Sequence, residues 1–331
     1  MNNKGLTTYL NAIPLPMSGL VLALLSCGIF LSSIGVEWGA AIFIIFASII
    51  TVVLHVKLLF DFQDCLTQLK NPVILSVFPT FSMSLMLFCV LLRKIPVFYD
   101  ISYVLWGLAI VVHTVLSVIF IVKYLLQSSV TMANIFPSWF IPFVGFGMIT
   151  VTAPHFDAFI LGQWMLWISF VGYVILLPFI LAKILIYRDL PEKIMPLTMI
   201  LSTPGSLCLA GYLVVIEQKN GWFIGILYVV SQLSYFIAVA HLPKLLKLPF
   251  YPSYSAFTFP IVISATVSNS ILKMDVFTSK IATILFTGLV HLELALAFVM
   301  VIYVSIRYMH FVWDKWKVSR DNKHSNVARI Q

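Results

Sequence analysis

The sequence predicts an all-α integral membrane protein with ten transmembrane helices. Of its 331 residues, 61% are hydrophobic and only 10% are charged, and the mean hydropathy is +1.04. A soluble domain needs more charge than this to cover its surface. A spanning helix needs roughly 20 apolar residues. Ten such stretches nearly fill the chain, which leaves no room for a sizeable soluble domain.

The ten stretches follow one another with short connections, and each is taken as one helix. They divide the chain into a cytoplasmic N-terminal segment (1–13), a transmembrane domain (14–310) and a basic cytoplasmic tail (311–331). The fifth stretch, PSWFIPFVGFGMITVTAP, is short and holds three prolines, so a broken or re-entrant segment is an alternative there. We expect helices at 14–34, 37–60, 73–92, 101–125, 137–153, 158–187, 196–216, 221–242, 253–272 and 279–310.

Lysine and arginine set the orientation of these helices, because cytoplasmic loops carry an excess of both. With the N-terminus inside, 15 of the 20 basic residues fall on inner segments and five on outer loops. Both termini are therefore expected on the cytoplasmic side of a plasma membrane. Trp313 and Trp316, among lysines, are typical of a membrane interface. The polar stretch from Ser319 onward predicts no regular structure.

Charge and cysteine usage exclude several classes of protein. The net charge of +8 lies in loops and in the tail, so it indicates attraction to anionic lipid headgroups and no nucleic-acid partner. The N-terminal MNNKGLTTYLNAIPLP lacks the pattern of a cleaved signal peptide, and its first apolar stretch is expected to be retained. The four cysteines are scattered without a CxxC pair, so no disulfide framework, metal site or cofactor is indicated.

Prolines recur at regular intervals in the odd-numbered helices. Proline removes a backbone hydrogen bond and clashes with the preceding turn, so it kinks a helix. A membrane tolerates such a kink where protein or a cavity satisfies the freed backbone groups. Each proline is followed two to four positions later by a small residue. The pairs are Pro16 and Gly19, Pro79 and Ser82, Pro142 and Gly145, Pro204 and Ser206, and Pro260 and Ser264, and the prolines are 63, 63, 62 and 56 residues apart.

This repeat predicts five helix pairs, each a kinked helix followed by a straighter one. Pro178 is the clear exception on an even helix. Because two crossings return the chain to the same side, the five pairs are related by an axis along the membrane normal. The kinked helices would form an inner ring, where small residues allow close approach around an axial space. The alternative is that the prolines only shape helix packing.

Four segments, in their order and spacing, resemble the tellurite-resistance and dicarboxylate transporter family, which also includes the slow anion channels of plant guard cells. The segments are PLPMSGLVLALLS in the first helix, FPSWFIPFVG in the fifth, TPGSLCLAGYL in the seventh and YSAFTFP in the ninth. The resemblance covers nearly the whole hydrophobic region. The chain departs from the family pattern at Met17-Ser18, where aromatic or glycine-rich variants are usual.

The resemblance implies five hairpins in a quasi-fivefold arrangement around a central pore, with the odd helices inside, and homotrimers with one pore in each subunit. It also implies passage of small anions and a phenylalanine of the ninth helix that plugs the pore. The matching residue in AFTFP is Phe259, directly before the kinking proline. Phe257 lies on a different helical face and is the weaker candidate. The alternative for Phe259 is a ring packed between helices.

The chemistry of the odd helices favours small monovalent anions. No Lys or Arg falls within their expected hydrocarbon region, and an apolar pore penalises any ion that enters it. Weakly hydrated anions lose least, so nitrate, iodide and bromide should pass at least as readily as chloride. Serines in helices more often bond to their own backbone, but hydroxyl donors along the path could come from Ser82, Ser84, Ser206, Thr258 and Ser264.

Three titratable residues lie at membrane depth, where such groups are functional candidates. His113 falls near the middle of the fourth helix, and His291 and Glu293 lie midway along the tenth. One interpretation is proton coupling. The other, favoured by their position on even helices, is a neutral hydrogen-bonded group between helices or at a subunit interface.

Two functions therefore stay open: a passive anion channel, or a proton-coupled carrier of a C4-dicarboxylate or a tellurite-like oxyanion. The lack of a basic group in the inner helices favours the channel, because a dicarboxylate needs compensating positive charge. An enzyme is not expected, since the chain has neither HExxH nor GxSxG. In His291-Leu292-Glu293, the two polar side chains leave a helix on different faces.

Overall fold

The computed structural model describes residues 9–274 and 279–327, and within these ranges the chain is helical without any strand. Nine helices of the described chain are long and apolar enough to cross a membrane. One further pair, 137–144 and 147–156, is bent by 48° at a short break and makes a tenth crossing if it is taken as one span. The expected all-α, multi-pass membrane fold is confirmed. The spans are numbered in chain order, with the bent pair as the fifth.

Each odd-numbered span is interrupted, so that an α-helix follows a shorter helical segment. The spans are η1 (Leu15–Met17) with α2 (Ser18–Ser33), α5 (Pro72–Val77) with α6 (Thr80–Arg93), η4 (Pro137–Trp139) and α8 (Phe140–Val144) with α9 (Gly147–Thr152) and η5 (Ala153–Phe156), η7 (Glu192–Ser202) with α11 (Thr203–Val215), and η8 (Pro252–Phe257) with α13 (Phe259–Leu272).

Each even-numbered span consists mainly of one long α-helix. These helices are α3 (Glu37–Phe60), α7 (Tyr99–Ile121) between η2 (Pro96–Phe98) and η3 (Val122–Leu126), α10 (Phe159–Ala182) with η6 (Lys183–Tyr187), α12 (Gly221–Leu245) and α14 (Lys280–Val327), and the short α4 (Phe62–Gln68) follows α3. Pro178 and Pro243 lie inside α10 and α12 without ending them.

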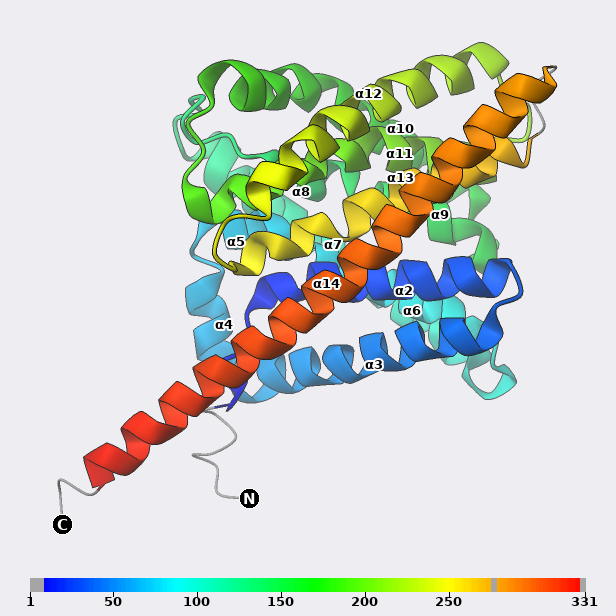
Figure 1. Cartoon of the computed structure of the whole chain (residues 1–331). Coiled ribbons are helices and arrows are strands. Elements are labelled where there is room, and N and C mark those ends of the chain that lie inside the picture. The colour runs from blue at the N-terminus through cyan, green and yellow to red at the C-terminus, as the bar shows by residue number, and fades with distance from the viewer. Residues whose placement is uncertain (1–8, 275–278, 328–331) are drawn as a thin grey trace.

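The last helix is longer than the sequence predicted. α14 continues to Val327 and its C-terminal part projects beyond the body of the molecule (Figure 1). The expectation of no regular structure from Ser319 is therefore wrong for 319–327. The segment 311–327 is polar but contains neither proline nor glycine, so nothing in it ends a helix that has already formed.

The repeated prolines lie at the interruptions of the odd spans. Pro16 precedes α2 within η1, Pro79 directly precedes α6, Pro142 lies in α8 before the 48° bend, and Pro204 and Pro260 are the second residues of α11 and α13. A proline at the start of a helix loses no intrahelical bond, because the first N–H groups have no partner there. Each interruption therefore places the beginning of an α-helix within the membrane-spanning region. For the fifth span, the alternative of a broken or re-entrant segment is confirmed by the 48° bend.

Odd and even spans differ in burial. In the first, third, seventh and ninth spans, 78–83% of the most apolar stretch is buried inside the protein, whereas in the five even spans the share is 22–39%. The inner helices also contact one another in a closed sequence: α2 contacts α6, α6 contacts α9, α9 contacts α11, α11 contacts α13, and α13 contacts α2. Each of them also contacts the even helix that follows it in the chain.

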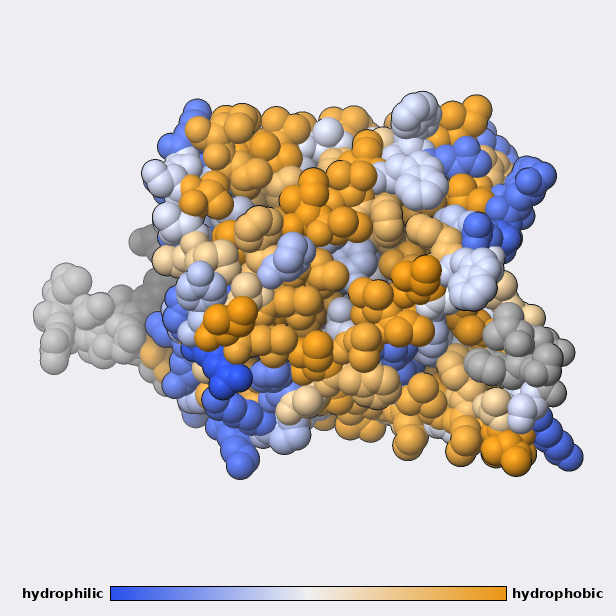
Figure 2. All heavy atoms as spheres, turned by 90° about the horizontal axis from the view of Figure 1, so that it is seen from above, coloured by the Kyte–Doolittle hydropathy of each residue, from blue (hydrophilic) through white to orange (hydrophobic). Residues whose placement is uncertain are grey.

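The outer surface suits a bilayer. Figure 2 shows one side of the molecule, where hydrophobic residues cover the middle and hydrophilic residues gather at two opposite ends. Large apolar side chains on the even spans are exposed, among them Ile160 and Ile226. The beginning of the described chain, before α2, and the C-terminal end of α14 lie at the same end of the molecule (Figure 1), which agrees with ten crossings if the bent pair is one span.

Two buried lysines tie even helices to the segments that precede their odd partners. The Lys57 ammonium donates to the Leu10 carbonyl at 2.8 Å and pairs with Asp61 at 3.1 Å and Asp64 at 2.7 Å. The Lys183 ammonium likewise donates to the Met132 carbonyl at 2.8 Å. It pairs with Asp189 at 2.8 Å. The two arrangements match each other two repeats apart, and both hold the ends of a helix pair together.

Candidate functional site

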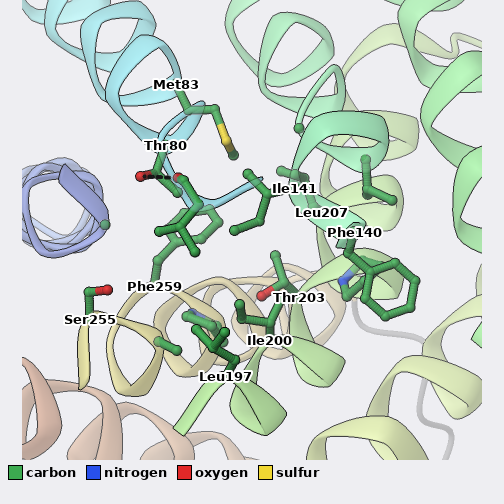
Figure 3. Close-up of a pocket in the computed structure, with 17 residues that line it drawn as sticks. Thr80, Met83, Phe140, Ile141, Leu197, Ile200, Thr203, Leu207, Ser255 and Phe259 are labelled. Carbon is green, nitrogen blue, oxygen red and sulfur yellow. Dashed lines mark hydrogen bonds between the residues drawn. The ribbon is translucent and has the colours of Figure 1, made fainter. Parts of the chain in front are cut away.

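A small cavity lies where the interruptions of the odd spans meet (Figure 3). Its volume is about 40 Å³, enough for only a few water molecules at roughly 10–15 Å³ each. All five odd spans contribute to its wall, and no even span does. The lining residues are Gly19 of the first span, Val77, Thr80 and Met83 of the third, Phe140, Ile141, Val144 and Gly145 of the fifth, Leu197, Ile200, Thr203, Pro204 and Leu207 of the seventh, and Ser255, Ala256, Phe259 and Pro260 of the ninth.

No charged side chain of the described residues lines this cavity, and its polar side chains are three hydroxyls. The Thr80 hydroxyl donates to the Val77 carbonyl at 2.8 Å and lies 2.7 Å from the Ser18 hydroxyl. The Thr203 hydroxyl, in contrast, is buried and has no hydrogen-bond partner. A buried hydroxyl without a partner costs free energy, so Thr203 offers an unused donor to anything that enters the cavity.

The beginnings of four α-helices face the same cavity. Its wall includes residues of the first turns of α2, α6, α11 and α13, which are 13–16 residues long. Unpaired N–H groups and the helix dipole give an α-helix a partial positive charge at its N-terminus. The segments before them end nearby with opposite polarity: α2, α11 and α13 follow 3₁₀ segments, whose hydrogen bonds are less well aligned, and α6 follows the six-residue α5. Because the α-helices that begin here are longer than the segments that end here, we expect a weakly positive potential without a basic side chain.

Phe259 is the aromatic residue of the ninth span at the cavity. It is the first residue of α13, its side chain is only 5% exposed, and it lines the cavity together with Phe140 of the fifth span (Figure 3). Phe257 does not line the cavity; it is fully buried and its ring lies 4.6 Å from that of Tyr254. Of the two phenylalanines in AFTFP, only Phe259 is placed to obstruct this space.

The other residues singled out in the sequence divide into two groups. Gly19, Gly145, Pro204 and Pro260 line the cavity, whereas Pro16, Pro79, Ser82, Pro142, Ser206 and Ser264 do not. The hydroxyls expected along the path bond to the backbone instead: Ser82 to the Pro79 carbonyl, Ser84 to Phe81, Thr258 to Ser255 and Gly19, and Ser206 and Ser264 both to Ser202. Ser206 and Ser264 also meet each other at 3.1 Å, which links the seventh and ninth spans.

Thr80, Thr203 and Ser255 were missed by the sequence reasoning. Thr80 follows Pro79 and Thr203 precedes Pro204, so the prolines themselves marked the right place. Of the small residues after the prolines, Gly19 and Gly145 also line the cavity, whereas the three serines do not. In α6, α11 and α13 the first turn reaches the cavity, and in α11 Leu207 of the second turn reaches it as well.

Glycines allow two close approaches at the cavity wall. A Cβ on Gly19 would lie 3.2 Å from the Ser255 Cβ, so the first and ninth spans meet closely there. A Cβ on Gly145 would lie 2.4 Å from the Ile141 carbonyl oxygen and 2.6 Å from His113 Cε1. Glycine at both positions keeps the spans close together around the small cavity.

The titratable residues at membrane depth lie in different surroundings. His113 is fully buried, and its Nδ1 lies 3.0 Å from the Ser82 hydroxyl of the third span. Its Nε2 is buried without a hydrogen-bond partner, so the hydrogen-bonded interpretation holds for one ring nitrogen only. Glu293 is also buried, but neither of its carboxyl oxygens has a hydrogen-bond partner. His291 is exposed on the outside of α14. Among the described residues, no group of three or more side chains could hold a metal ion.

Buried, interrupted spans around an internal uncharged cavity define a membrane channel or transporter. The chain matches the family model SLAC1, described as a voltage-dependent anion channel, over residues 11–304. The protein therefore belongs to this family, and its general function is that of an anion channel or transporter. The match confirms the relation to slow anion channels that the four sequence segments indicated. The comparison with curated proteins found no match.

Proposed function

We propose that the protein conducts small monovalent anions, namely nitrate, chloride and other halides, along an axis through the central cavity. The five helix pairs form hairpins in a quasi-fivefold arrangement with the odd spans inside, and Phe259 closes the path. The protein acts in the plasma membrane with both termini in the cytoplasm, as a homotrimer with one pore in each subunit.

One observation carries this proposal: a single cavity bounded by all five odd spans and by no even span. Packing alone does not require five helices to share one space, since each could bury its prolines against its own partner. The closed sequence of contacts among α2, α6, α9, α11 and α13 supports the same arrangement. The volume of about 40 Å³ corresponds to a closed path, with the Phe259 ring among the groups that fill it.

The chemistry of the cavity supports the choice of ion. A cation gains nothing from a space that lacks carboxylates and faces helix N-termini. An anion is stabilised by the weakly positive potential and by the Thr203 hydroxyl, but no fixed positive charge repays the loss of a strong hydration shell. Small monovalent anions with weak hydration are therefore favoured over chloride and strongly over a dicarboxylate.

The replacement Phe259→Ala tests the gate. It removes the ring from the cavity wall, and each ~1.4 kcal/mol taken off the barrier raises the rate about tenfold. We expect anion current in oocytes or planar bilayers to rise at least about tenfold on this basis. Phe257→Ala is the matched control, because Phe257 is buried away from the cavity. Unchanged current in well-expressed Phe259→Ala protein, or equal gains in both variants, would remove Phe259 from the gate.

A proton-coupled carrier of a dicarboxylate or a tellurite-like oxyanion is the second candidate. It is favoured by one observation, the burial of the ionisable His113 and Glu293 within the spans. The two functions differ in reversal potential. A channel follows the anion gradient alone, whereas the reversal potential of a symporter shifts when pH changes on one side. Flux of chloride, nitrate and malate into liposomes at two pH values distinguishes them.

A further inference from the structure

A second cavity lies on the outer side of the protein, between α12 and the first half of α14. Its volume is about 630 Å³, and it shares no lining residue with the central cavity. Residues of α12 on its wall are exposed to the bilayer, with Val229 56% and Leu233 58% exposed. Ile271 and Met274 at the end of the ninth span complete it. We call this space the lateral crevice.

Two glycines create the lateral crevice. Gly221 and Gly225 lie one turn apart on α12, and a Cβ added to either would find no atom within 4 Å. Small residues at this spacing usually let two membrane helices approach closely. Here α14 leaves the glycine face open, so the space is available to a molecule dissolved in the bilayer.

One residue on the wall of the lateral crevice carries a buried polar group. Gln232 lines it and is only 6% exposed. Its Nε2 donates to the Ser268 hydroxyl at 2.8 Å, and its Oε1 is buried with no hydrogen-bond partner. In the apolar interior of a membrane, an unpaired amide oxygen costs considerably more than in water. A ligand that donates to this oxygen would remove that cost.

Glu293 adds a second unpaired group directly beyond the lateral crevice. Phe286 and Leu289 of α14 line the crevice, and Glu293 follows on the same helical face. The Ser268 hydroxyl of the ninth span is bonded to Gln232 and Tyr228. Neither carboxyl oxygen makes a hydrogen bond of good geometry. The deep end of the crevice therefore has more acceptors than donors.

We propose that the lateral crevice binds a neutral membrane-dissolved alcohol, with its hydrocarbon body along α12 and its hydroxyl donating to Gln232 Oε1. No Lys, Arg or His is among the lining residues, so an anionic headgroup would find no counter-charge. From Gly221 to Gln232 the helix makes eleven steps, which correspond to about 16 Å, and this length suits an extended chain with one polar end. This site is separate from the ion path and does not depend on conduction.

The binding of n-dodecanol to the purified protein tests the proposal, with the dissociation constant taken from the concentration dependence of the thermal unfolding midpoint. n-Dodecane serves as the probe without a hydroxyl and dodecanoate as the anionic one. We expect dodecanol to bind most tightly and dodecanoate least. Gln232→Leu should weaken dodecanol binding about threefold to tenfold, the value of one hydrogen bond, and leave dodecane unchanged.

Gly225→Leu provides an independent arm, because its new side chain meets open space and fills the lateral crevice. It should abolish the binding of both dodecanol and dodecane. Gly107→Leu, at an equally open glycine on α7, should change neither. Equal binding of dodecanol and dodecane to the native protein, or unchanged dodecanol binding in Gly225→Leu, would show adventitious partition only. If Gly225→Leu instead dissociates an oligomer without affecting dodecanol, a second copy covers this face and the proposal is wrong.

Discussion

Thr80 and Thr203 both line the central cavity, but their hydroxyls differ in what they bond to. Thr80 is held by the Val77 carbonyl and the Ser18 hydroxyl, whereas Thr203 has no partner. The sequence could not separate them, because both are threonines beside a repeated proline. The difference arises from which carbonyls lie within reach once the segment before each break has folded. At the residue scale, the repeated prolines predict where the cavity lies, but they do not predict which of its hydroxyls lacks a hydrogen-bond partner.

Thr203→Val tests whether that donor contacts the ion. The two side chains have similar volume, and no protein hydrogen bond is lost, so folding should be unaffected or slightly stabilised. A hydrogen bond to a charged group contributes about 1.5–3 kcal/mol, so we expect anion flux through an open variant to fall roughly tenfold or more. Thr198→Val is the control, since the Thr198 hydroxyl bonds to the Met195 carbonyl away from the cavity. Equal losses in both variants would indicate a structural role only.

Gly145→Ala tests the close approach at the cavity wall. The added Cβ would lie 2.4 Å from the Ile141 carbonyl oxygen, so backbone must shift. Overpacking of this kind costs about 1–3 kcal/mol, and we expect a lower unfolding midpoint. Gly107→Ala should instead raise the unfolding midpoint. Its Cβ meets no atom within 4 Å, and alanine is more favourable than glycine in a helix by about 0.5–1 kcal/mol. Similar midpoints for the two variants would contradict the contact at Gly145.

At the element scale, the proline spacing predicted the interruptions because proline changes the backbone in a way that sequence alone reveals. Pro79, Pro204 and Pro260 each begin an α-helix after a break, and Pro142 precedes the bend of the fifth span. The η7 segment could not be predicted, since a long 3₁₀ stretch is uncommon and Glu192–Ser202 packs against α12 and η8, which follow later in the chain. The same holds for α14, whose length beyond residue 310 has no signal in hydropathy.

The link between α3 and the N-terminal segment predicts a pH dependence of stability. Burial raises the pKa of Asp64, but the hydrogen bonds from Lys57 and Gln68 outweigh it and leave the pKa below the ordinary value of 3.8. A depressed folded-state pKa contributes stability that is present above the unfolded-state pKa and is lost as pH falls through the folded-state pKa. Stability of the native protein should therefore decrease below about pH 4.

Asp64→Asn should be less stable at neutral pH and should lose less stability on acidification, because it no longer takes up that proton on unfolding. Unfolding midpoints measured between about pH 6 and pH 3 give the comparison. Asp100→Asn, at an exposed position at the start of α7, is the control and should follow the native curve. If the unfolding midpoint of Asp64→Asn depends on pH as that of the native protein does, the ion pair between Lys57 and Asp64 does not influence folding stability.

At the scale of the whole molecule, the cavity arises from repetition. Each of the five odd spans brings residues near its interruption to one wall, so five weak features converge on one space although no single segment encodes a site. Hydropathy predicted the number of spans and the prolines predicted which would be buried. Side-chain placement depended on contacts between pairs, as in the hydrogen bond between Ser206 and Ser264, 58 residues apart. Such contacts have no signature within either segment.

The helix N-termini around the cavity predict an order of permeability among anions. Helix N-termini supply only partial charge, about half an elementary charge each, and they stand in for the basic side chains that the cavity lacks. Partial charges can offset the free energy of losing a weak hydration shell more fully than that of losing a strong one. Nitrate should therefore permeate at least as well as chloride, and malate, with two charges, should permeate least. With Phe259→Ala to open the path, replacing external chloride by nitrate should move the reversal potential to more negative values. It should do so equally at two pH values, since no titratable side chain of the described residues lines the cavity. A preference for chloride over nitrate would require a strong fixed charge on the path, and a pH-dependent reversal potential would favour the proton-coupled carrier instead.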